Sequence, residues 1–141
     1  MIVLFTDFGL DGPYTGQMKA VLAQMAPSIA VIDLFADAPV GNPKASAYLL
    51  AAYASWFPAG TVFLCVVDPG VGGPRPAIII QADGSWYVGP GNGLFDLVER
   101  RAGKAQGFDI AAAWGFLGEV HVRFGSKADS LHSVTLCPLC P

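Results

Sequence analysis

The residues best suited to chemistry are aspartates that follow apolar runs of the chain. Asp7 and Asp68 come after the runs 2–5 and 61–67, and Asp33 lies at the end of the run 30–34. If the runs are strands of one parallel sheet, their carboxyl ends share the edge at which open α/β sheets bind ligands. We therefore expect Asp7 and Asp68 to face a small ligand. Each could instead cap the helix or turn that follows, and that alternative stays open.

Two glycine-rich segments accompany these aspartates. Residues 68–75 read DPGVGGPR, in which glycines allow backbone N–H groups to approach a ligand and Asp68 and Arg75 could form an ion pair. Residues 89–93 read GPGNG, but Leu94 stands where the dinucleotide fingerprint G-x-G-x-x-G requires glycine. From the residues alone, the sequence predicts a small-ligand site formed by Asp7, the 68–75 loop and Asn92. The 68–75 loop could also be only a rigid turn.

The elements that would position these residues can be read from hydrophobic periodicity. The apolar runs 2–5, 30–34 and 61–67 predict strands buried in a sheet. A helix is predicted from Tyr14 to near Pro27, with its apolar face formed by Tyr14, Met18, Val21, Leu22 and Met25. Asn42-Pro43 is typical of a helix start. We expect that second helix to end at Pro58 and to have one face lined by Ala45, Tyr48, Leu49, Ala52 and Trp56.

This alternation of strands and helices predicts an α/β fold with a mostly parallel sheet covered by helices on both faces, in three layers. Two more strands are expected at 77–81 and 86–88, joined in a hairpin by the turn Asp83-Gly84. A short helix is expected at 94–101.

Composition excludes several classes of protein. The 141 residues are 53% hydrophobic and 13% charged, which excludes disorder, and the mean hydropathy is +0.49. A net charge of -3 without a basic stripe argues against nucleic-acid binding. Pro58 and Gly60 interrupt the longest apolar stretch, 45–67, and the first residues lack the basic region of a signal peptide, so we expect no membrane partner. Three cysteines form no disulfide framework, and we expect a cytoplasmic protein.

The motifs together resemble a known family, the S-adenosyl-L-methionine hydroxide adenosyltransferases, which are related to the adenosyl fluorinases and chlorinases. The resemblance extends from Met1 to about Val98. The matching segments are Thr6-Asp7-Phe8-Gly9, Pro13-Tyr14, Gly16-Gln17-Met18-Lys19, Phe57-Pro58, Gly60-Thr61-Val62, Val66-Val67-Asp68-Pro69-Gly70-Val71-Gly72 with Arg75, Gly89-Pro90 and Asn92-Gly93.

The resemblance implies hydrolysis of S-adenosyl-L-methionine to adenosine and L-methionine, by attack of water or hydroxide at the ribose C5′. The resemblance implies that the reaction uses no cofactor and no metal, with S-adenosyl-L-methionine as the substrate. Asp68 and Arg75 would be catalytic, and Asp7 would bind the ribose hydroxyls. The other substrate-binding residues would be Phe8, Asp11, Tyr14, Pro69, Gly70, Val71 and Asn92. The halogenating relatives lack the aspartate of the 68–75 loop, which favours hydroxide over halide.

The sequence also departs from the family pattern. Gly12 and Gly91 stand where the family has aspartates, and the family's D-x-x-H-D segment lacks its histidine between Asp33 and Asp37. The family's third catalytic residue is a histidine, and neither His121 nor His132 lies in the matching motif. An ordinary strand or surface histidine is the stronger interpretation of each.

We expect residues 1–118 to form an incomplete N-terminal α/β domain and 119–141 to be an atypical tail. The family's C-terminal β-barrel domain would be missing, as in a truncated member. Family homotrimers bind substrate between one subunit's large domain and the next subunit's barrel. The Cys137-x-x-Cys140 pair could be half of a zinc site or a redox motif. Three functions stay open, namely a hydrolase, an adenosine or S-adenosyl-L-methionine binding module without turnover, and an inactive fragment.

Overall fold

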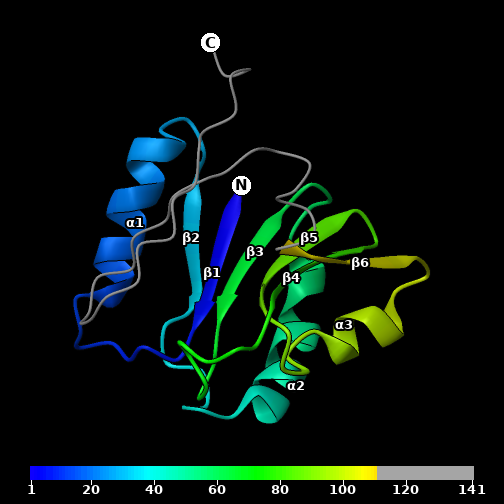
Figure 1. Ribbon diagram of the computed structural model, residues 1–141. Coiled ribbons are helices and arrows are strands. Elements are labelled where there is room, and N and C mark those ends of the chain that lie inside the picture. The colour runs from blue at the N-terminus through cyan, green and yellow to red at the C-terminus, as the bar shows by residue number, and fades with distance from the viewer. Residues whose placement is uncertain (111–141) are drawn as a thin grey trace.

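The computed structural model describes residues 1–110, which form one six-stranded mixed sheet with helices packed on it (Figure 1). The order of the strands across the sheet is β2-β1-β3-β5-β4-β6. The strands are β1 (Ile2–Thr6), β2 (Val31–Phe35), β3 (Val62–Val66), β4 (Ala77–Ala82), β5 (Ser85–Pro90) and β6 (Ala105–Asp109). The helices are α1 (Tyr14–Met25), α2 (Pro43–Tyr53), the 3-10 turn η1 (Ala54–Trp56) and α3 (Asp96–Arg101).

The parallel part of the sheet confirms the predicted α/β fold. β1 pairs in parallel with both β2 and β3, and β3 pairs in parallel with β5, whereas β4 is antiparallel to β5 and β6. The chain moves from β1 to β2 on one side and then to β3 on the other. Right-handed crossovers in opposite directions place α1 and α2 on opposite faces of the sheet. The topology therefore has a switch point between β1 and β3.

Side-chain contacts agree with this placement of the two helices. Lys19 of α1 forms an ion pair with Asp33 of β2, and Asp33 is in register with Leu4, so α1 lies on the Leu4 face. On the other face, Phe35 packs edge-on against Tyr53 of α2, with 5.6 Å between the ring centroids. In Figure 1, α1 runs alongside β2, while α2 and α3 lie together across the sheet from it.

The core lies between the sheet and the layer formed by α2 and α3. Its sheet side is built from alternate residues of the central strands, which the pleat directs to one face. Phe63 and Tyr87, on neighbouring strands, stack with their ring centroids 4.8 Å apart. The buried residues of this core include Val3, Phe5, Leu50, Phe63, Cys65, Val67, Leu94, Phe95 and Val98.

The start of α2 confirms the sequence prediction, but its buried face does not. Asn42 Oδ1 accepts a hydrogen bond from the Ala45 amide at 3.0 Å, and Pro43 is the first helical residue. The buried residues of α2 are Ser46, Ala47 and Leu50, whereas Tyr48, Ala52 and Trp56, predicted to share the apolar face with Ala45 and Leu49, are exposed. The prediction was wrong because α2 carries apolar residues around its whole circumference, so periodicity could not identify the side facing the sheet.

Helix α1 forms where its periodicity predicts, but none of its residues is buried within the described part of the chain. Tyr14, Val21 and Met25 are exposed. Among residues 1–110, no helix has the length and apolar character needed to cross a bilayer.

The predicted hairpin is confirmed at β4 and β5. Asp83 and Gly84 both have left-handed backbone conformations, with φ of 46° and 81°, as a two-residue hairpin turn of this kind requires. The sequence analysis missed β6, whose residues Ala105–Asp109 are all exposed and show no apolar alternation. Pairing with β4 produces this edge strand.

Candidate functional site

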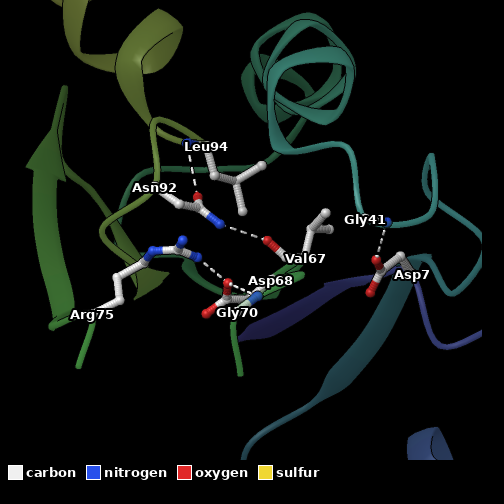
Figure 2. A network of polar contacts seen from close by, with 8 residues as sticks. All are labelled: Asp7, Gly41, Val67, Asp68, Gly70, Arg75, Asn92 and Leu94. Atoms are coloured by element: carbon white, nitrogen blue, oxygen red, sulfur yellow. Dashed lines mark hydrogen bonds and ion pairs between the residues drawn. The ribbon is translucent and has the colours of Figure 1, made fainter. Parts of the chain in front are cut away.

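The candidate site lies at the carboxyl ends of β1 and β3, the two strands on either side of the switch point. Asp7 directly follows β1, and Asp68 is two residues beyond β3. Figure 2 shows the two aspartates at neighbouring positions along this edge. The crevice at such a switch point is where open α/β sheets bind ligands. The tertiary structure thus brings together the two residues that the sequence analysis singled out.

Asp7 is fixed by the loop that precedes α2. Its Oδ2 accepts a hydrogen bond from the Gly41 amide at 2.8 Å (Figure 2). Gly41 has a φ of 58°, a left-handed conformation that glycine adopts without strain. The other carboxylate oxygen makes no hydrogen bond to residues 1–110. It is an acceptor that a ligand hydroxyl could use.

Asp68 anchors the glycine-rich loop by its Oδ1 atom. This oxygen accepts a hydrogen bond from the Gly70 amide at 2.8 Å and a second from Nη1 of Arg75, which confirms the predicted ion pair. The Arg75 guanidinium lies against Gly70, because a Cβ at that glycine would be 3.1 Å from Nη2. The Asp68 side chain is only 12% exposed, against 34% for Arg75. The carboxylate is thus partly desolvated while its second oxygen is left for a water or a ligand.

The two loops of the site lie close to each other at Gly41 and Pro69. A Cβ at Gly41 would lie 3.7 Å from the Cβ of Pro69, which is ordinary van der Waals contact. The loop that holds Asp7 therefore lies close to the loop that carries Asp68, with room between them for little more than a methyl group.

Asn92 is engaged with the backbone of the same site. Its Nδ2 donates to the Val67 carbonyl at 2.8 Å, and its Oδ1 accepts from the Leu94 amide at 3.2 Å (Figure 2). The turn that follows β5 thereby contacts the residue that directly precedes Asp68.

The other predicted substrate-binding residues lie on the same loops, except Tyr14, which is the first residue of α1. The rings of Phe8 and Tyr14 are 5.7 Å apart, and Tyr14 is 58% exposed. Asp11, Pro69 and Val71 are also exposed. Asp33, also at a strand end in the sequence analysis, lies inside β2 and pairs with Lys19, away from the Asp68 loop.

The sequence analysis missed the backbone groups that hold the site residues, because residue types carry no information about backbone hydrogen bonds. The Gly41 amide and the Val67 carbonyl are examples, although the helix-start pattern at Asn42-Pro43 lies next to Gly41.

Beneath the loop, burial raises the pKa of the Cys65 thiol far above its usual range, so Cys65 is a protonated core residue and not a nucleophile.

Outside this site, the described part of the chain offers a pocket but no cluster of metal-ligating side chains. Residues 1–110 contain no group of His, Cys, Asp and Glu side chains arranged to hold a metal ion. A pocket of about 990 Å³ lies at the β4–β5 turn, at the opposite end of the sheet from Asp68. The Asp83 carboxylate there already accepts hydrogen bonds from the Gly103 and Lys104 amides.

His121, His132, Cys137 and Cys140 lie outside the described residues, as does the predicted tail 119–141.

Comparison with known proteins agrees with the motifs. Residues 2–126 match the model of the SAM hydroxide adenosyltransferase N-terminal domain. The chain is 47% identical over 97 residues to an (R)-S-adenosyl-L-methionine hydrolase of Thermus thermophilus, covering 68% of this chain and 37% of the relative. A protein of the same name from Methanocaldococcus jannaschii is 35% identical over 108 residues, covering 73% of this chain and 41% of the relative.

A solved structure is similar as well. The crystal structure of an uncharacterized conserved protein from Thermotoga maritima superimposes with a TM-score of 0.75 at 36% identity, covering 78% of this chain and 42% of that one. The chain thus spans roughly two fifths of the length of the proteins it matches. With the domain model matched over most of its residues, the chain belongs to the SAM hydroxide adenosyltransferase family.

Proposed function

We propose that this chain takes part in the hydrolysis of (R)-S-adenosyl-L-methionine to adenosine and L-methionine. The observation that carries the proposal is the Asp68–Arg75 pair beside Asp7 at the switch point of the sheet. The name of two relatives that are 47% and 35% identical supports it.

The reaction balances with water as the only second reactant. The water oxygen forms a bond to the ribose C5′ while the C5′–S bond breaks and its electron pair goes to sulfur. The sulfonium becomes the neutral thioether of methionine, and the water proton is released. Because the leaving group is already activated by its positive charge, the proposed reaction needs no cofactor.

The site residues divide between binding and water positioning. Asp7, held by the Gly41 amide, presents its second oxygen to the ribose hydroxyls. Asp68, held by Arg75 and the Gly70 amide, presents its second oxygen to the attacking water. Rate enhancement then comes from orienting water against C5′ and from excluding bulk solvent. Phe8 and Val71, on the loops around this position, and Tyr14, at the start of α1, would contact the substrate.

We further propose that the active assembly is a homotrimer in which a neighbouring subunit completes the site. The exposure of Tyr14 and Val71 on the site loops leaves room for such a contact. The proposed setting is the cytoplasm, which suits the free buried thiol of Cys65.

The deciding experiment incubates the purified chain with S-adenosyl-L-methionine and follows adenosine and methionine by chromatography. The expected result is release of both products in equal amounts, lost in Asp68→Asn and retained in Asp33→Asn. The second variant is a matched control, since Asp33 is also paired with a cation but lies on β2 beside α1. Calorimetric binding of the substrate without product release would instead support a binding module, and neither binding nor turnover would support an inactive fragment.

A further inference from the structure

We propose that Asn92 is a positioning residue, which holds the Asp68–Arg75 loop in its productive pose through the backbone and makes no contact with substrate. The consequence for catalysis rests on the function proposed above, whereas the consequence for the loop does not. The geometry that carries the inference is the turn at residues 91–95, which joins β5 to α3.

This turn holds the loop at both of its ends. Asn92 Nδ2 donates to the carbonyl of Val67, the residue before Asp68, at 2.8 Å. The Gly91 amide donates to the carbonyl of Pro76, the residue after Arg75, at 3.0 Å. The loop therefore leaves and rejoins the sheet at two points that are hydrogen-bonded to successive residues of one turn.

The hydrogen bond to Val67 acts on Asp68 through the planarity of the peptide. The Val67 carbonyl and the Asp68 amide belong to one rigid plane, so a donor that fixes the oxygen also fixes the direction in which the chain enters Asp68. Val67 is fully buried, and its side chain is fixed in the core. Asn92 thus fixes the backbone of Asp68 through the Val67 peptide, and Arg75 fixes the Asp68 carboxylate directly.

The turn is itself anchored to β3. A Cβ at Gly89 would lie 2.3 Å from the Cys65 carbonyl oxygen, so the end of β5 is pressed against the strand that leads to Asp68. Asn92 Oδ1 also accepts from the Leu94 amide, and Leu94 is fully buried. The side-chain amide of Asn92 is therefore held in place, because its Nδ2 and Oδ1 atoms are both hydrogen-bonded to backbone groups.

The first test compares three variants by hydrogen exchange. Asn92→Asp keeps the acceptor for Leu94 and removes the donor to Val67, whereas Asn92→Ala removes both. We expect the Gly70 and Gly73 amides, which are bonded to Asp68 Oδ1 and to the Gly70 carbonyl, to exchange about tenfold faster in both variants. Val98→Ala is the control, because it shortens a buried side chain of α3 and lowers global stability without removing a contact of the loop. Equal acceleration in the control would overturn the proposal.

The second test uses kinetics with S-adenosyl-L-methionine. Asn92→Asp should lower kcat and leave KM within about twofold, because it disturbs Asp68 and removes no substrate contact. A raised KM with unchanged exchange at Gly70 would show that Asn92 binds substrate and would overturn the proposal. If the unaltered chain shows no turnover, the proposed function fails while the exchange measurement still decides the role of Asn92.

The third test needs no variant and so does not depend on their folding. In the unaltered chain, the Asn92 side-chain amide protons should exchange more slowly than those of a free asparagine amide, because one of them is bonded to Val67. Exchange at the free rate would contradict the inference.

Discussion

Asp68 and Arg75 form an ion pair that closes a short loop, in which glycine and proline supply five of the six intervening residues and Val71 is the sixth. Asp68 lies two residues beyond β3, beside the switch point of the sheet. The same Asp68 oxygen accepts the Gly70 amide, so one atom organises the charge pair and the turn.

If the proposed function holds, replacing Arg75 by alanine should lower hydrolysis of S-adenosyl-L-methionine roughly 100-fold, because the carboxylate proposed to position the water loses its orienting partner. The free energy of unfolding should change by less than about 1 kcal/mol, since Arg75 is a third exposed and such ion pairs contribute little. Product chromatography measures the first quantity and urea denaturation the second. A large loss of stability would show that the pair is mainly structural.

Replacing Asp7 by asparagine should weaken adenosine binding about 10- to 100-fold, as expected for the loss of hydrogen bonds to a charged acceptor. The amide still accepts from Gly41, so the loop before α2 should keep its position. Isothermal calorimetry with adenosine measures the effect, with Asp33→Asn as the matched control. Unchanged affinity in Asp7→Asn would remove Asp7 from the binding site.

Replacing Gly89 by alanine should destabilise the fold by about 1–3 kcal/mol or more, because the new Cβ would meet the Cys65 carbonyl oxygen at 2.3 Å. Replacing Gly16 by alanine is the matched control. Gly16 lies inside α1 with open space around it, and alanine there should stabilise the helix by roughly 0.5–1 kcal/mol. Thermal unfolding of the two variants should therefore shift in opposite directions, and a shift of the same sign would contradict the packing at Gly89.

Replacing Tyr87 by phenylalanine should raise the pH at which the protein unfolds in alkali. Burial, with added negative charge from Asp83, raises the pKa of Tyr87 from 10.0 to about 12. A raised pKa of an acidic group stabilises the folded state fully below pH 10, and this contribution is lost as the pH rises through 12. Phenylalanine keeps the stacking on Phe63 without a group that titrates.

Circular dichroism between pH 9 and 12 measures this effect. The unaltered protein should unfold at lower pH than Tyr87→Phe. Coincident curves would show that the Tyr87 hydroxyl does not control alkaline stability, leaving the buried thiol of Cys65, whose raised pKa acts in the same direction.

The strands and turns near the site were predictable because their signals are local. β1 and β3 are short apolar runs, and Asp83-Gly84 supplies the left-handed conformations of its hairpin turn. The Asn42 cap and Pro43 marked the start of α2 for the same reason. The positions of Asp7 and Asp68 followed from these elements, since residues after parallel strands meet at one edge.

Features that depend on partners distant in the chain could not be predicted in this way. The buried side of α2 is Ser46, Ala47 and Leu50, because those residues face the sheet, although its exposed side is also apolar. Residues 105–109 form the edge strand β6 because their backbone groups pair with β4, and not because of their side chains. In neither case does the segment itself contain the information.

The sequence by itself determined the alternation of strands and helices, the strand-end placement of Asp7 and Asp68, and the family to which these motifs belong. The tertiary structure decided which atoms hold the two carboxylates. Gly41 and Val67 act through backbone groups, which every residue carries, and Asn92 reaches across 25 positions of the chain to the Val67 carbonyl. Periodicity and motifs report side-chain chemistry along the chain, whereas these hydrogen bonds exist only once the sheet has brought the loops together.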